Sequence, residues 1–230
     1  MHLILVPGFW LGGWSWDRVT PFLTAAGRHV HSPTLPGLES VHDDRSGIGL
    51  AEHVAAVTDL VDSLEANVVL VGHSGGGTII HAAVDRRPDQ VRHAIYVDSG
   101  PTAHGAAINT QLAAEGDDVP LPPWREFESV NLRGLNEETL NFFRANAVPQ
   151  PRGVARDPQI LNNEARFDVP VTLIATTITM DEVRRGIADG DPDLVELGRI
   201  KHHGLSELPT GHWPQFSRPE DLAEAILDAW

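Results

Sequence analysis

Residues 68–76 read Val68-Val69-Leu70-Val71-Gly72-His73-Ser74-Gly75-Gly76, an apolar run followed by a Gly-x-Ser-x-Gly motif. A continuous apolar run is typical of a strand that is covered on both faces. After Gly77, apolar residues recur with helical spacing, so the motif is expected between a strand and a helix. This context is typical of a nucleophile elbow, a sharp turn that points the hydroxyl of Ser74 into a cleft.

The rest of the chain alternates between strand-length apolar runs and helical patterns. Strands are expected at residues 3–6, 29–35, 68–71, 94–97, 171–175 and 204–208. An amphipathic helix is expected where apolar residues step by three and four, at Leu50, Val54, Val57, Val61 and Leu64. Such alternation predicts an α/β fold, in which helices cover both faces of a parallel sheet.

Residues 101–168 interrupt this alternation. The segment is too long for a simple connection between two strands, and it contains one clear helical pattern, at about residues 136–146. We interpret it as a small, mainly helical cap. The cap is inserted into a core that residues 1–100 and 169–230 form together.

Composition narrows the classes of partner. The 230 residues include 32 acidic and 17 basic side chains, which gives a formal net charge of −15. Such a surface repels phosphate backbones and anionic lipid headgroups, so we expect neither a nucleic-acid nor a membrane partner. The sequence is also compatible with a homodimer.

The chain has no cysteine, which excludes disulfides, thiolate chemistry and cysteine-based metal sites. This composition is typical of a cytoplasmic protein. The first residues include no basic leader, and no apolar run approaches the ~20 residues of a membrane span. We therefore expect a cytoplasmic protein without a signal peptide.

A serine hydroxyl needs a general base, because its own pKa lies far above neutrality. The best candidate among twelve histidines is His212, in the loop Leu208-Pro209-Thr210-Gly211-His212-Trp213-Pro214 before the last helical pattern. A base in that position follows the chain order expected with a nucleophile elbow. Neighbouring His202 and His203 would point to opposite faces of a strand, and no third ligand has suitable spacing, so we expect no metal site.

The opening Leu5-Val6-Pro7-Gly8-Phe9-Trp10-Leu11-Gly12-Gly13-Trp14-Ser15-Trp16, the elbow and the terminal Gly211-His212 together resemble the α/β-hydrolase superfamily. The opening is most similar to the branch that contains plant methyl esterases and hydroxynitrile lyases. The resemblance covers about residues 2–100 and 169–230, while the cap matches poorly. It implies an α/β-hydrolase fold of about six mostly parallel strands, with no cofactor.

The resemblance also implies an oxyanion hole, formed by the backbone N–H groups of Phe9 and Gly75. That branch usually has histidine where this chain has Pro7. Proline lacks an N–H, but the expected donor is the N–H of Phe9, two positions later, so Pro7 does not remove a donor from the oxyanion hole.

Two aspartates remain alternatives for the acid that would orient His212. Asp181 follows the expected strand at 171–175, where the family most often places its acid, but it lies late, five residues past Thr176. The sequence from Thr179 to Glu182 also fits a capping box, which would put Asp181 in the first turn of a helix. Asp98 ends the preceding expected strand, a position that some family members use.

The sequence therefore predicts a serine hydrolase that cleaves a carboxylic ester of a small, largely apolar substrate through an acyl-enzyme intermediate. Trp10 and Trp213 are expected to line an aromatic substrate pocket. One alternative is a non-catalytic ligand receptor on the same fold. The other is a lyase of the hydroxynitrile lyase type. Those enzymes have a lysine directly after the catalytic histidine, whereas this chain has Trp213, which disfavours the lyase.

Overall fold

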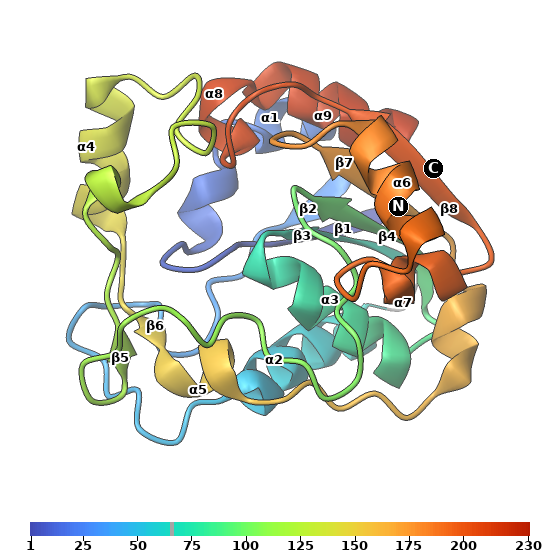
Figure 1. Ribbon diagram of the computed structural model, residues 1–230, viewed down its shortest axis with the longest axis horizontal. Coiled ribbons are helices and arrows are strands. Elements are labelled where there is room, and N and C mark those ends of the chain that lie inside the picture. The colour runs from blue at the N-terminus through green and yellow to red at the C-terminus, as the bar shows by residue number, and fades with distance from the viewer. Residues whose placement is uncertain (65–66) are drawn as a thin grey trace.

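A computed structural model describes residues 1–64 and 67–230 of the chain. Six strands form one sheet in the order β2-β1-β3-β4-β7-β8, and every neighbouring pair is parallel. The sheet crosses the middle of the molecule, with helices on both sides (Figure 1). The strands are β1 (His2–Val6), β2 (His29–His31), β3 (Val68–His73), β4 (Val91–Val97), β7 (Val171–Ala175) and β8 (His203–Glu207).

The two faces of the sheet are buried by different helices. On one face, Leu3 and Leu5 of β1 pack in a cluster with side chains of α1 (Thr20–Ala25) and α9 (Pro219–Asp228). On the other face, residues of α2 (Leu50–Ser63) and α3 (Gly75–Arg86) share a larger cluster with Ile4 and Val6. The alternation of side chains along each strand thus directs apolar groups into two cores. The remaining helices of the core are η1 (Gly13–Trp16), α6 (Met180–Asp189), α7 (Val195–Arg199) and α8 (Pro214–Ser217).

Residues 101–168, the cap segment, lie between β4 and β7 in the chain. In Figure 1 the cap segment passes along the side of the molecule that carries α4 and then beneath α3. Long loops join its regular elements, which include an antiparallel pair of short strands. These elements are β5 (Asp118–Val119), η2 (Trp124–Glu126), α4 (Glu137–Asn146), β6 (Gln150–Pro151), α5 (Arg152–Arg156) and η3 (Glu164–Asp168).

Most elements fall where the sequence pattern predicts them. The predicted helical stripe of α2 is buried at Leu50, Val54, Val57 and Val61. The exception is β2, which ends at His31 rather than at residue 35. Pro33 and Pro36 follow, and a proline has no N–H to donate to a neighbouring strand, so the pairing with β1 stops early.

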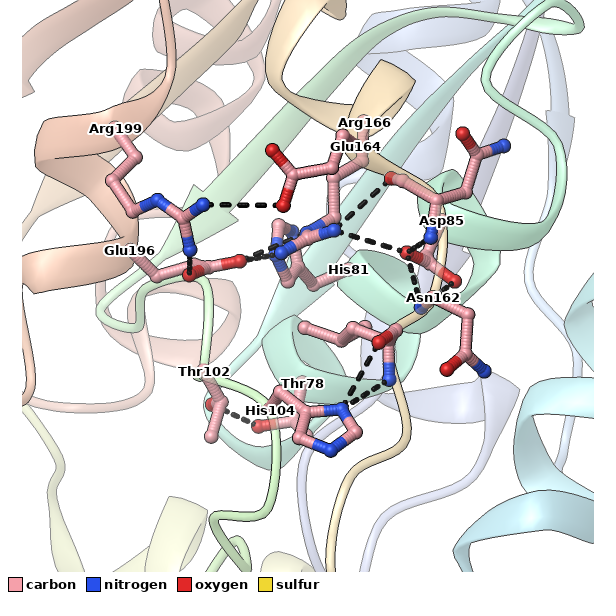
Figure 2. A network of polar contacts seen from close by, with 12 residues as sticks. Thr78, His81, Asp85, Thr102, His104, Asn162, Glu164, Arg166, Glu196 and Arg199 are labelled. Carbon is pink, nitrogen blue, oxygen red and sulfur yellow. Dashed lines mark hydrogen bonds and ion pairs between the residues drawn. The ribbon is translucent and has the colours of Figure 1, made fainter.

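A buried polar network ties the far end of α3 to the end of the cap segment and to α7 (Figure 2). Arg166 donates to Glu196 Oε1 of α7 at 2.9 Å and to Asp85 Oδ1 of α3 at 3.3 Å. His81 Nε2 donates to the same glutamate oxygen, so its neutral Nδ1 accepts from the Tyr96 hydroxyl at 2.9 Å. Burial lowers the pKa of His81, which favours this neutral form.

This network generates a stability prediction. Arg166→Met removes the cation between two buried carboxylates, so the free energy of unfolding should fall by about 3–5 kcal/mol. Arg199 pairs with the other side of Glu196, but its side chain is 49% exposed. Arg199→Met should therefore cost at most about 1 kcal/mol. Urea unfolding followed by circular dichroism measures both, and equal losses in the two variants would contradict this account.

Candidate active site

Ser74 sits at a strained turn between β3 and α3. Its φ of 51° and ψ of −125° lie in a region that residues with a side chain rarely adopt. Three hydrogen bonds hold the turn: Ser74 N–H donates to Val97 O, while Gly77 N–H and the Ser99 hydroxyl donate to Ser74 O. The turn therefore keeps the Ser74 side chain in a fixed direction at the start of α3.

The glycines of the motif let three backbone segments meet at this turn. A Cβ on Gly72 would lie 2.6 Å from the carbonyl oxygen of Gly76. A Cβ on Gly76 would lie 2.7 Å from the carbonyl oxygens of both Val6 and Pro7. Any larger residue at these two positions would push α3 away from β1 and β3, and with it Ser74.

A chain of two hydrogen bonds runs from Ser74 through His212 to Asp98. His212 Nδ1 lies 2.6 Å from Asp98 Oδ2, and because a carboxylate only accepts, Nδ1 carries the proton. His212 Nε2 then accepts from the Ser74 hydroxyl across 2.9 Å. This is the arrangement in which a histidine can take a proton from a serine while an acid fixes its tautomer.

Asp98 is built to remain ionised. Burial of its side chain opposes ionisation, but hydrogen bonds from His212 and the two threonines after β7 outweigh that effect and lower its pKa. Its Oδ1 accepts from the N–H groups of Thr176 and Thr177 and from the Thr177 hydroxyl. The Asp98 carboxylate that accepts from His212 is thus ionised and held in one orientation.

Asp181, the alternative acid, lies elsewhere. It occupies the first turn of α6, where Thr179 and Glu182 form the capping box that the sequence predicts. Its side chain is 82% exposed and pairs with Arg184 at 2.9 Å. Of the two aspartates, only Asp98 contacts His212.

The loop that carries His212 is held from three sides. The cap segment supplies two carbonyl oxygens: Asn131 O accepts from His212 N–H, and Arg133 O from Gly211 N–H. From the sheet side, the Thr176 hydroxyl donates to Gly211 O. From the elbow, His73 Nε2 donates to His212 O at 2.6 Å.

These contacts were missed by the sequence analysis. Nothing in the pattern around residues 131–133 points to the histidine loop, because the contact joins parts of the chain about 80 residues apart. The one available signal was that His73 lies within the elbow, next to Ser74.

Ser74 opens into a pocket of about 490 Å³, the serine pocket. Phe9, Trp10 and Trp213 all line it, together with Gly75 and Asp98. The three aromatic side chains come from the loop after β1 and from the histidine loop, so they lie beside the hydrogen-bonded residues.

The aromatic walls are fixed by specific contacts. Trp10 has a φ of 65°, and its indole N–H donates to Val119 O of the cap segment at 2.9 Å. The Trp213 ring packs edge-on against the rings of Phe127 and Phe143. The pocket is thus preformed, with one wall supplied by the core and one by the cap segment.

Phe9 and Gly75, the residues expected for an oxyanion hole, lie next to each other. A Cβ on Gly75 would lie 2.8 Å from the Phe9 ring, so the ring rests directly on this glycine. Gly75 is also the first residue of α3, and the first N–H groups of a helix have no partner within it. Thr78 and Thr102 also line the serine pocket, and their hydroxyls form a hydrogen bond of 2.6 Å (Figure 2).

The sequence profile described as the alpha/beta hydrolase family matches residues 3–225. The chain belongs to this family. A carbendazim hydrolyzing esterase from Nocardioides sp. (strain SG-4G) is 26% identical over an alignment of 246 positions, which spans 98% of this chain and 98% of the relative. A pyrethroid hydrolase from Sphingobium wenxiniae is 27% identical over 248 residues, covering 98% of this chain and 86% of the relative.

Plant proteins match as well, as the resemblance in the sequence implied. A methyl jasmonate esterase from Vitis vinifera is 24% identical, over 99% of this chain and 95% of the relative. The crystal structure of an Arabidopsis methylesterase superposes with a TM-score of 0.79 at 24% identity, over 99% of this chain and 98% of that chain. The family match and these relatives make the protein a hydrolase enzyme.

Two further properties of the hydrolase concern the residues that the structure describes. Within them, no three or more histidine and carboxylate side chains are grouped so that they could hold a metal ion. Nor does any helix in the described ranges combine the length and apolar character needed to cross a membrane.

Two buried histidines make the stability of the hydrolase depend on pH. Burial lowers the pKa of His73 to about 3 and that of His53 to about 4, from an ordinary value of 6.5. Between these values and pH 6.5 the unfolded chain binds more protons, so acidification favours unfolding. The free energy of unfolding should therefore fall as the pH drops below 6.5, by at most about 1 kcal/mol per pH unit for each histidine.

Urea unfolding at pH 7.5, 6.5 and 5.5 measures this dependence. We expect little change between the first two values and a clear loss at the third. His53→Gln serves as a control, because glutamine can still donate to Pro36 O, the partner of His53, but does not titrate. The pH dependence should become shallower in that variant, and a free energy that stays constant down to pH 5.5 would contradict the account.

Proposed function

We propose that the hydrolase is a serine esterase that cleaves a carboxylic ester of a small, largely apolar substrate through an acyl-enzyme at Ser74. One observation carries the proposal: the unbroken hydrogen-bond chain Ser74–His212–Asp98 at a pocket with aromatic walls. The two bacterial relatives are named as an esterase and a pyrethroid hydrolase, and their names support ester hydrolysis.

The first half of the reaction follows from the geometry. Ser74 Oγ attacks the ester carbonyl carbon while His212 Nε2 takes its proton, and the carbonyl electron pair moves to oxygen. Backbone N–H groups of Phe9 and Gly75 stabilise that oxyanion. Asp98 balances the positive charge on His212. The intermediate then collapses, and the alcohol leaves with the proton from His212.

The second half repeats these steps with water. His212 removes a proton from a water molecule, which attacks the acyl carbon bound to Ser74. Collapse of the second intermediate breaks the bond to Ser74 Oγ, which regains its proton from His212. The ester, water and three side chains supply every proton and electron pair, so the proposal requires no cofactor.

The serine pocket favours uncharged groups around the ester carbonyl. Aromatic rings of Phe9, Trp10 and Trp213 offer flat apolar surface close to Ser74, while Asp98 is occupied by His212. Trp213 stands where lyases of the resembling branch have a lysine, which disfavours that alternative. A complete hydrogen-bonded triad also disfavours a non-catalytic receptor, since binding alone does not require it.

We further propose the setting in which this enzyme works. Residues 1–100 and 169–230 form the hydrolase core, and residues 101–168 form a cap that shapes specificity. The absence of cysteine supports a cytoplasmic location. The enzyme takes small-molecule esters as partners, and we propose a homodimer as an arrangement open to test.

The two aspartates provide a matched test. Asp98→Asn should lower kcat by about 10⁴-fold, because the amide favours the wrong imidazole tautomer and cannot balance its charge. Asp181→Asn makes the same chemical change at an exposed position, so its kcat should stay close to that of the unsubstituted enzyme. Hydrolysis of p-nitrophenyl acetate measures both, with circular dichroism as a check of folding. Equal effects of the two substitutions would overturn the assignment of Asp98.

A further inference from the structure

A second pocket lies next to the serine pocket and is formed entirely by the cap segment. This cap pocket has a volume of about 690 Å³. Both pockets share three lining residues, Leu112, Phe127 and Asn131, so the two pockets adjoin each other along these side chains. Each volume falls within the roughly 300–1,000 Å³ of ordinary small-molecule sites, so each can hold a separate chemical group.

The walls of the cap pocket are mostly apolar. Besides Leu112 and Phe127, the apolar lining residues are Ala113, Pro120, Leu121, Pro122 and Pro123. These side chains are only partly buried by the rest of the chain, apart from Ala113, which is exposed. The pocket therefore offers apolar surface that a ligand could remove from water.

The cap pocket is held in shape by named contacts. Three prolines fix the backbone over residues 120–123. The Arg144 guanidinium donates to the carbonyl oxygens of Leu121 and Pro122 and stacks on the Trp124 ring. On the opposite wall, Asn109 Oδ1 accepts from the N–H groups of Gln111 and Leu112. A preformed pocket costs a ligand less ordering on binding.

The charged side chains that line the cap pocket are all carboxylates, whereas the nearby Arg144 guanidinium is bound to the carbonyl oxygens of Leu121 and Pro122. Glu115, Glu126 and Glu128 line the cap pocket, and Asp193 lies in the lining of the serine pocket. Among the described residues, neither lining includes a lysine or an arginine. A carboxylate on a ligand would meet lining side chains of its own charge in the cap pocket, whereas an uncharged group would not be opposed.

We propose that the cap pocket is a distal subsite, which binds the far end of an ester with a long apolar group and rejects one whose far end is anionic. The inference rests on the proposed esterase function and adds the substrate class. The scissile carbonyl lies at Ser74, and the long group passes Leu112 and Phe127 into the cap pocket. Each methylene fully buried there raises kcat/KM about fourfold.

Filling the cap pocket tests the proposal. Ala113 lines the cap pocket but not the serine pocket, so Ala113→Trp should block only the former. Ala145→Trp is the matched control, since Ala145 is exposed on α4 and lines neither pocket. The substrates are p-nitrophenyl acetate and decanoate, which differ in the acyl group, and ethyl and decyl acetate, which differ in the alcohol.

We expect Ala113→Trp to lower kcat/KM by at least about tenfold for the long ester of one of the two pairs. A tenfold decrease corresponds to the lost burial of fewer than two methylene groups. Both short esters should be cleaved as before, and Ala145→Trp should change nothing. The proposal is overturned if both long esters are unaffected by Ala113→Trp, or if the short esters lose as much as the long ones.

A charge test uses two substrates of equal length. The mono-p-nitrophenyl ester of sebacic acid ends in a carboxylate, whereas p-nitrophenyl decanoate ends in a methyl group. The decanoate should be preferred, and Glu126→Lys should narrow that preference by placing a cation at the cap pocket. An unchanged preference in this variant would contradict the proposed role of charge.

A binding measurement separates this inference from the proposed function. The dissociation constant of a long ester is measured in the Ser74→Ala variant, with and without Ala113→Trp. The ester used is the one whose cleavage Ala113→Trp slows, or both long esters if the enzyme cleaves neither. A weaker affinity with Ala113→Trp supports the subsite even if the enzyme cleaves none of the esters. Failure of the proposed function would appear instead as absent turnover, or as turnover that survives Ser74→Ala.

Discussion

The hydrogen bond between His212 Nδ1 and Asp98 Oδ2 is the contact on which the rest of the site depends. It brings a buried carboxylate at the end of β4 to a histidine 114 residues later in the chain. Such a carboxylate is tolerated only when several donors compensate for the loss of water. Thr176 and Thr177 after β7 supply these donors, so the adjacency of β4 and β7 in the sheet is itself a requirement of the site.

The cap segment does more than cover the pocket. Its carbonyl oxygens at Asn131 and Arg133 hold the backbone of the histidine loop, and Asn131 also lines both pockets. The elbow contributes from the other side through His73. In the proposed mechanism, Asn131 thus both lines the serine pocket and positions the base, which links specificity to the placement of His212.

Local sequence patterns predicted those parts of the molecule whose conformation depends on residues close together in the chain. The elbow at Ser74 follows from an apolar run beside glycines, and the stripe of α2 follows from helical spacing. The choice of His212 as the candidate base rested only on its place in the chain order. The choice between Asp98 and Asp181 could not be made, because it depends on which strand ends lie side by side and how far each following loop reaches. The cap pocket could not be predicted from the sequence either, because residues 111–131 come together as its walls only in the folded chain.

Covalent labelling of Ser74 tests the central claim most directly. A fluorophosphonate reacts with a serine only when a neighbouring base and an oxyanion hole activate the hydroxyl. We expect one adduct per chain, which peptide mass spectrometry places on Ser74 and which is lost in the Asp98→Asn variant on the same timescale. No adduct on the folded enzyme, or an adduct on a different residue, would contradict the account.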